Sequence, residues 1–268
     1  DEASQMPADQ FLAHLQLIKH DSMELQQSFV ESGRIDEAVT LPLKIDALTK
    51  VVFVGDHMQL PPVQQVKPPK NLEIVLSSLF SYFVKAHGID YRQLEYNYRS
   101  NRKIVDITNN LGFYDRRIIP SIFSRENKIP EIGPFLKPWV ARILDPAKIV
   151  NVLLHDEQYD ISVSIAEAQL TSMLVAGLYT SYLSTGRISN LDDEAEFWSK
   201  VVGVAAPHNA QCHLIRRIIS TLIKPEYISH NDLQQKLKNA IVSVDKFQGS
   251  ARAVIVCSIG ISAIEKIK

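Results

Sequence analysis

The sequence predicts an α/β protein in which helices cover both faces of a parallel sheet. Three observations support this fold class. Short β-branched apolar runs alternate with longer segments of helical periodicity, and the apolar runs end in polar or glycine-containing turns. Apolar residues make up 46% of the 268-residue chain, which suffices for an ordinary buried core. Strands that alternate with helices typically form a parallel sheet between helical layers.

Five apolar runs are predicted strands, and the clearest is 50–54, which is apolar on both faces and ends in the turn at Gly55. The other four are 148–154, 201–205, 240–244 and 253–259. Residues 164–184 and 209–223 are predicted helices, because their apolar residues recur on one stripe. Proline and glycine mark 23–43 as an insertion and 121–148 as a connecting loop.

Composition limits the possible partners. The formal net charge is -1, so nucleic-acid binding would have to use local patches. The two cysteines, Cys212 and Cys257, have no metal-ligand spacing and suggest a reducing compartment. No signal peptide is evident, and no apolar run reaches the roughly 18 residues of a membrane span. We therefore expect a soluble, cytoplasmic protein without membrane contact; because it begins at Asp1, it looks cut from a longer chain.

An acid pair opens the sequence. Asp1 and Glu2 could divide labour in phosphoryl transfer, one holding Mg²⁺ and the other orienting or deprotonating the attacking water. Adjacent acids are common, so a pair of solvated carboxylates at a frayed terminus is the alternative.

The second motif, 55–62, follows the strand predicted for 50–54 and would reach the carboxyl edge of the sheet, where α/β proteins bind ligands. The amide of Gln59 can donate and accept, and could sense a γ-phosphate and its neighbouring water. Pro61 and Pro62 restrict the backbone where the chain leaves this loop. The alternative is a strand-to-loop turn with capping polar residues.

The third motif is 94–100. Tyr98 offers a flat face for an adenine base, and Arg99 offers a permanent charge suited to a phosphate in the transition state. Ser100 could cap a helix at 102–111. Surface packing is the alternative for the Tyr-Arg pair.

Two further motifs, 204–211 and 243–250, each follow a predicted strand. Free N–H groups at the helix start near His208 and Asn209 favour an anion such as a nucleic-acid phosphate. The polar groups of 243–250 could meet both nucleotide and strand backbone. The alternatives are a plain turn capped by Asn209 and an exposed turn.

The order of these five motifs resembles that of superfamily 1 helicases, most closely the 5′-to-3′ branch containing RNA-surveillance and replication-repair enzymes. The resemblance extends from Asp1 to about Ile259. It implies a RecA-like P-loop NTPase fold with ATP in the cleft between two lobes and a single strand across the top. The first lobe would be partial, 1–86, and the second largely complete, 87–268.

The resemblance also implies roles for individual residues. Asp1 matches the magnesium partner and Glu2 the general base. Gln59 matches the γ-phosphate sensor, Tyr98 the adenine-stacking residue and Arg99 an arginine finger. The residues predicted to contact nucleic acid are Pro61, His208, Asn209, Ser243, Asp245 and Lys246.

Gln248 and Gly249 fall in the motif that couples nucleotide to nucleic acid. The sequence differs from the family pattern in two respects. Relatives commonly have an acid where Ala251 stands, and no G-x-x-x-x-G-K-[ST] loop occurs in these residues. The resemblance therefore predicts part of an ATP- and Mg²⁺-dependent helicase or translocase acting on single-stranded DNA or RNA, inactive as this fragment alone. A non-catalytic RecA-like module that binds nucleic acid or protein is the alternative. DNA or RNA, the direction of travel and the oligomeric state stay open.

Overall fold

The computed structural model describes residues 52–56, 58–59, 69–70, 73, 78–86, 88–121, 136–155 and 163–260. Asp1, Glu2 and Pro61 lie outside these ranges, as do the predicted insertion at 23–43 and residues 122–135 of the predicted loop at 121–148. The chain divides into two compact units. The first comprises Asp1–Glu95 with Gly112–Arg117, and the second comprises Tyr96–Leu111 with Ile118–Lys268. The predicted lobe boundary between 86 and 87 stays a prediction.

The first unit contains a small aromatic cluster around two short helical elements. Helix α3, Leu79–Ser81, begins after Ser78, whose hydroxyl accepts a hydrogen bond from the Ser81 N–H at 3.2 Å. The π-helix η2, Tyr82–Ala86, continues it directly. The cluster consists of Leu79 and Phe80, with Phe53, Tyr82, Phe83, Val84 and Tyr91 packed against them.

The predicted buried strand at 50–54 is not borne out, because residues 52–56 have no regular secondary structure. Val52 and Val54 are 79% and 65% exposed, while Phe53 stacks on Phe83 with ring centroids 4.5 Å apart. A strand that is buried on both faces needs hydrogen-bonded neighbouring strands, and this segment is in neither of the two sheets formed by the described residues. Its apolar residues therefore bury one aromatic ring instead of a whole strand.

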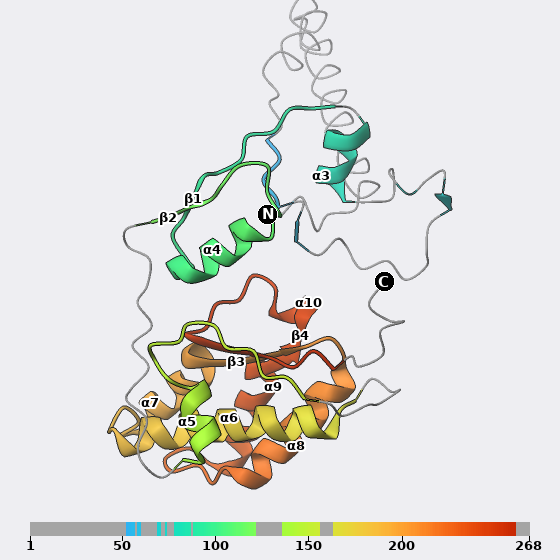
Figure 1. The fold of residues 1–268 in the computed structure, drawn as a ribbon. Coiled ribbons are helices and arrows are strands. Elements are labelled where there is room, and N and C mark those ends of the chain that lie inside the picture. Colours follow the sequence, from blue (N-terminus) through green and yellow to red (C-terminus); the bar gives the residue numbers. More distant parts are fainter. Residues whose placement is uncertain are drawn as a thin grey trace, which may run out of the picture. The chain divides into compact units, whose positions relative to one another are not determined.

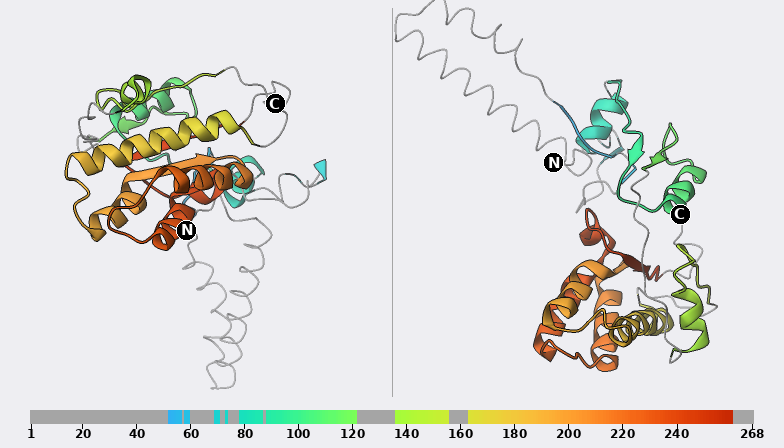
Figure 2. Two further views of the ribbon diagram at one scale, coloured as in Figure 1. Left: turned by 90° about the horizontal axis from the view of Figure 1, so that it is seen from below. Right: turned by 90° about the vertical axis from the view of Figure 1, so that its left-hand side faces the viewer.

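The second unit contains most of the described elements (Figures 1 and 2). Its strands are β1 Tyr96–Asn97, β2 Ile119–Pro120, β3 Val202–Ala206, β4 Ile241–Ser243 and β5 Val254–Cys257. Its helices are α4 Arg102–Asn110, α5 Pro138–Ile143, α6 Ile165–Ser184, α7 Leu191–Glu196, the π-helix η3 Phe197–Val201, α8 Asn209–Leu222, α9 His230–Ala240 and α10 Val244–Phe247.

The main sheet is parallel, with strand order β4-β3-β5. Val204 pairs with Ile241 on one side of β3 and with Val256 on the other. The connection from β3 to β4 and the connection from β4 to β5 run in opposite directions across the sheet. Because crossovers between parallel strands are right-handed, these two connections lie on opposite faces. Figure 1 shows α8 and α9 on one side of the sheet and α10 on the other. The predicted α/β class, with helices on both faces, is confirmed.

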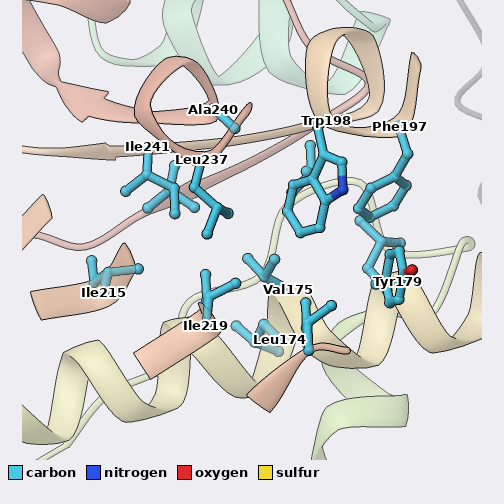
Figure 3. Packing of buried hydrophobic residues seen from close by; sticks show 14 of the residues in the cluster. Leu174, Val175, Tyr179, Phe197, Trp198, Ile215, Ile219, Leu237, Ala240 and Ile241 are labelled. Atoms are coloured by element: carbon cyan, nitrogen blue, oxygen red, sulfur yellow. The ribbon is translucent and has the colours of Figure 1, made fainter. Parts of the chain in front are cut away.

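The core lies between the sheet and helices α6, α8 and α9 (Figure 3). Ile241 points into it from the sheet, and Val175 and Ile219 lie on the helical side. Val204 of β3 belongs to the same buried cluster. Trp198 is 1% exposed and stacks on the ring of Tyr179 at 5.7 Å. Burial of one such large side chain contributes about 1.5–3 kcal/mol, so this core positions the strand ends firmly.

The predictions for the other segments had mixed outcomes. Those for 164–184 and 209–223 are confirmed by α6 and α8, and three predicted strands are confirmed by β3, β4 and β5. Residues 150–155 have no regular structure, and Val152 and Leu154 are 77% and 86% exposed, so the strand predicted for 148–154 is wrong. The helix predicted after Ser100 is α4, but Asn101 caps it by accepting a hydrogen bond from the Lys103 N–H at 2.9 Å.

Candidate nucleotide and nucleic-acid sites

The turn that carries Gln59 is organised by the carboxylate of Asp56. Its Oδ1 accepts a hydrogen bond from the Met58 N–H at 3.0 Å, and its Oδ2 accepts one from Nε2 of Gln59 at 3.1 Å. The Gln59 N–H also donates to the Asp56 carbonyl at 3.2 Å. The side chain of Gln59 is thus held at an exposed turn by an acid three residues earlier.

Tyr114 is a third partner of the same acid, which sequence reasoning did not single out. Its hydroxyl donates to Oδ2 of Asp56 at 2.7 Å. Partial burial, and then the hydrogen bond to Asp56, raise the pKa of Tyr114 far above its ordinary value, so the phenol stays a donor at neutral pH. The signal that the sequence offers is the run Phe113-Tyr114-Asp115, in which aromatic rings stand beside an acid.

Paired hydrogen bonds hold the segment around Tyr114 within the first unit. Nε2 of Gln93 donates to the Arg116 carbonyl at 2.7 Å, and the Arg116 N–H donates back to Oε1 of Gln93 at 3.1 Å. The Tyr91 hydroxyl donates to Asp115, and this bond raises the pKa of Tyr91. The segment that presents Tyr114 to Asp56 is therefore fixed on two sides.

Tyr98 and Arg99 project from a side-chain-stabilised turn in the second unit. Oδ1 of Asn97, the last residue of β1, accepts hydrogen bonds from the N–H groups of Arg99 at 2.9 Å and Ser100 at 2.8 Å. Both Tyr98 and Arg99 are exposed, and the ring of Tyr98 lies 6.3 Å from that of Tyr96. The turn presents an aromatic face and a guanidinium side by side.

His208 and Asn209 lie where β3 passes into α8. His208 occupies the N-cap position without a side-chain cap bond, and Asn209 is the first helical residue, so Asn209 is not the cap. Both are exposed. N–H groups in the first turn of a helix have no partner within the helix and favour an anion.

Gln211, the last residue of the same motif, is fully buried and ties three chain segments together. Its Oε1 accepts from the Ser164 N–H at 2.9 Å, and its Nε2 donates to the Ser164 carbonyl and to Oγ of Ser258, both at 3.1 Å. Glu167 accepts from Oγ of Ser258 and from the Gly260 N–H, both at 2.8 Å, and its Oε1 lies 3.2 Å from Nε2 of His155. Gln211 therefore fixes the start of α8, which carries the motif, to the segments around Ser164 and Ser258.

The fifth motif forms α10 and the turn after it. Ser243 is buried, whereas Asp245 and Lys246 are exposed. The Gln248 N–H donates to the Val244 carbonyl at 3.1 Å, and Gly249 has φ +76°, a left-handed conformation that favours glycine. The turn thus needs a glycine at this position.

The register of the sheet brings two of the predicted motifs to one edge. Ala206, at the end of β3, pairs with Ser243 at the end of β4, so His208 and Asp245 follow neighbouring parallel strands at their carboxyl ends. Ligands of open α/β sheets bind at this edge. Gln59 belongs to the first unit and Arg99 to the second, so their joint action on one phosphate stays a prediction.

The described residues contain no group of three or more His, Cys, Asp or Glu side chains that could hold a metal ion. The predicted Mg²⁺ partner Asp1, with Glu2, lies outside the described residues. Among the described helices, none combines the length and apolar character needed to cross a bilayer.

A parallel sheet with helices on both faces fits a RecA-like P-loop NTPase domain, and comparison with known proteins agrees. The model of the AAA domain family matches residues 75–266, so the chain belongs to this family. The resemblance to superfamily 1 helicases is confirmed.

Three individual relatives share a low sequence identity with the chain. The chain is 25% identical over 230 residues to the DNA replication ATP-dependent helicase/nuclease JHS1 of Arabidopsis thaliana, covering 84% of this chain and 16% of that protein. It is 27% identical over 250 residues to the DNA replication ATP-dependent helicase/nuclease DNA2 of Mus musculus, covering 85% and 21%. It is 24% identical over 224 residues to the DNA polymerase alpha-associated DNA helicase A of Schizosaccharomyces pombe, covering 79% and 28%. The chain thus spans less than a third of each of these relatives.

Proposed function

We propose that this chain is part of an ATP-dependent helicase or translocase motor that acts on single-stranded DNA. The observation that carries the proposal is the meeting of the 207–211 and 243–249 segments at the carboxyl edge of one parallel sheet, set by the pairing of Ala206 with Ser243. Exposed polar and charged groups, His208, Asn209, Asp245 and Lys246, follow the strand ends there. Such an edge can hold a phosphate backbone through N–H groups and side chains.

The names of the relatives favour DNA over RNA as the strand. The three quoted above carry DNA replication or DNA helicase in their names. Single strands are gripped mainly through the phosphate backbone and base stacking, which DNA and RNA share. The choice therefore needs a direct comparison of the two strands.

ATP would be handled by residues of both units. Gln59, oriented by Asp56, is the proposed sensor of the γ-phosphate, and Arg99 is the proposed arginine finger. The exposed ring of Tyr98, 66% accessible, is the proposed stacking face for adenine. Asp1 and Glu2 are the proposed magnesium and water partners, and Mg²⁺ would neutralise charge on the phosphates.

The test is an ATPase assay of the full-length protein with and without single-stranded DNA, and separately with single-stranded RNA. We expect DNA to stimulate hydrolysis and Arg99→Ala to lower kcat by roughly 10³ or more, as loss of an arginine finger does. Arg102→Ala is the matched control, since Arg102 is an exposed arginine at the start of the helix that follows. It should retain near-normal turnover.

A full-length protein that binds single strands without hydrolysing ATP would reject the motor and support a non-catalytic binding module. Residues 1–268 on their own should hydrolyse no ATP, since they contain no phosphate loop to cradle the triphosphate. Strand-stimulated hydrolysis by this fragment would contradict that expectation.

A further inference from the structure

Arg252 lies on the face of the sheet opposite the main core. A Cβ added to Gly203 of β3 would meet Cε2 and Cζ of Phe247 at 2.7 Å and Cγ of Arg252 at 2.8 Å. Phe247 and Arg252 thus rest directly on the backbone of the central strand, where only a glycine leaves room. Because Phe247 belongs to α10, Gly203 faces the side of the sheet that α10 covers (Figure 1). Its pairing partner Ile255 on β5 faces the same side.

The guanidinium of Arg252 is held in place by packing. Its Cζ lies 5.8 Å from the centroid of the Phe247 ring, within the range of a cation–π contact. Nη1 donates to the Ala251 carbonyl at 2.9 Å. With the ring on one side and the strand backbone beneath, the side chain has few rotamers left, which reduces the entropy lost when a ligand binds.

The charge of Arg252 has no acidic partner in the described part of the chain. The ion pairs found there involve other residues, and no hydrogen bond there engages Nη2 of Arg252. Nε is buried without a hydrogen-bond partner among the described residues. A half-buried guanidinium with unused donors is costly to hold without an anion, and its planar fork fits the oxygens of a phosphate.

The sequence beside Arg252 is also suited to an anion. The side chain of Ala251, next to Arg252, is a methyl group and brings no carboxylate to compete for the guanidinium. Lys246 of α10 adds a second exposed cation to the same turn, and Asp245 is the exposed acid next to it.

We propose that Arg252 binds a phosphate group at the 244–252 turn. The assignment rests on the proposed function, because it takes the phosphate to belong to the single strand or to the nucleotide. In both cases the chemistry is that of a guanidinium fork on phosphate oxygens.

The test measures binding of the full-length protein by fluorescence anisotropy, with labelled oligothymidylate in one arm and a fluorescent ATP analogue in the other. Arg252→Gln keeps a polar side chain with part of the aliphatic stem and removes the charge. Arg187→Gln is the matched control, because Arg187 also lies over an aromatic ring, with Cζ 5.6 Å from the Tyr182 centroid.

We expect Arg252→Gln to weaken binding of one probe about tenfold, and Arg187→Gln to leave both unchanged. If the phosphate belongs to the strand, the slope of log affinity against log salt for oligothymidylate should fall in magnitude by about 1. Loss confined to the ATP analogue assigns the nucleotide phosphates instead. Either result supports the phosphate contact.

Unchanged binding of both probes by Arg252→Gln, with normal salt-dependent binding by the wild type, would overturn the role of Arg252 and leave the proposed function standing. A wild type that binds neither probe would overturn both. If Arg252→Gln does not fold, Arg252→Lys decides, because lysine keeps the charge but lacks the bidentate fork. Wild-type affinity for both probes in that variant would also reject the assignment.

Discussion

The hydroxyl of Tyr114 lies 2.7 Å from Oδ2 of Asp56, and this hydrogen bond joins two residues 58 positions apart in the sequence. The same oxygen accepts a hydrogen bond from the side-chain amide of Gln59 at 3.1 Å. A phenol contributed by a distant segment therefore helps to fix the carboxylate that orients the proposed γ-phosphate sensor. The 112–117 segment belongs to the first unit, and this bond is one of those that hold it there.

Replacing Tyr114 with phenylalanine should reduce both stability and the order of the Gln59 turn. The ring remains, but Asp56 loses a donor, and a hydrogen bond of this kind contributes about 1 kcal/mol. We expect the free energy of unfolding to fall by about that amount in urea denaturation, and kcat of the full-length ATPase to fall more than its KM rises.

Tyr96→Phe is the control for Tyr114→Phe. Tyr96 is an exposed tyrosine in the second unit, and its hydroxyl makes no hydrogen bond within the described residues. Its removal should change the free energy of unfolding by less than about 0.5 kcal/mol. Equal effects of the two substitutions would refute a specific role for the bond to Asp56.

Gln211→Leu should destabilise the second unit strongly although the volume of the side chain is nearly kept. Leucine cannot replace the three hydrogen bonds to Ser164 and Ser258, so buried backbone and hydroxyl groups lose their partners. Each unsatisfied group costs about 1–3 kcal/mol, and the free energy of unfolding should drop by about 3 kcal/mol or more. The exposed Gln235 of α9 supplies the comparison, because Gln235→Leu should cost less than about 0.5 kcal/mol.

Periodicity predicted the elements that pack against one another and failed for apolar runs that lie outside the two sheets of the described residues. Residues 209–223 carry a clear apolar stripe, and the stripe is buried as α8 against the sheet. Residues 148–154 are equally apolar, yet Leu154 is 86% exposed. An apolar run becomes a strand only where neighbouring strands satisfy its N–H and C=O groups, and that depends on residues far away in the chain.

In the candidate site too, features set by neighbouring residues could be predicted, and features set by residues far apart in the sequence could not. The turns that present Arg99 and Gln248 could be predicted, because Asn97 and Gly249 specify them locally. Tyr114 and Arg252 could not, because their roles come from contacts with Asp56 and with Gly203, which only the fold brings near. Sequence spacing gives no information on such pairs.

Stability should decline in strongly alkaline solution because of Tyr179. Burial, and then its hydrogen bond to Glu194, raise the pKa of this tyrosine well above its ordinary value of 10.0. The folded state therefore keeps the phenol proton after the unfolded state has lost it. The free energy of unfolding should be unaffected by this group below about pH 10 and should fall as the pH rises beyond that value.

Urea denaturation at a series of pH values measures the decline, with Tyr179→Phe as the comparison. The phenylalanine variant has no phenol to titrate and should be less stable at neutral pH, but its stability should fall less steeply above pH 10. Parallel curves for the two proteins would show that Tyr179 does not contribute to the decline.

Glu194 is the residue whose loss should be most damaging outside the proposed sites. Its carboxylate is fully buried and accepts hydrogen bonds from the N–H groups of Tyr227 at 2.6 Å and Ile228 at 2.9 Å, and from the Tyr179 hydroxyl at 2.5 Å. The Glu226 N–H adds a longer bond at 3.3 Å. One side chain thus satisfies the donors of the loop between α8 and α9.

Glu194→Ala should lower the free energy of unfolding by about 3–5 kcal/mol, because it leaves these donors buried without an acceptor and opens a cavity. Glu194→Gln keeps the shape and one acceptor oxygen, and should cost less. The control is Glu196→Ala, two residues later. Its exposed carboxylate lies 3.3 Å from Nζ of Lys200, which is one helical turn away. That ion pair contributes about 0.3–0.5 kcal/mol at most, so urea denaturation should distinguish the two substitutions clearly. If the Glu194→Ala protein is as stable as the Glu196→Ala protein, the N–H groups of the loop between α8 and α9 have found other acceptors.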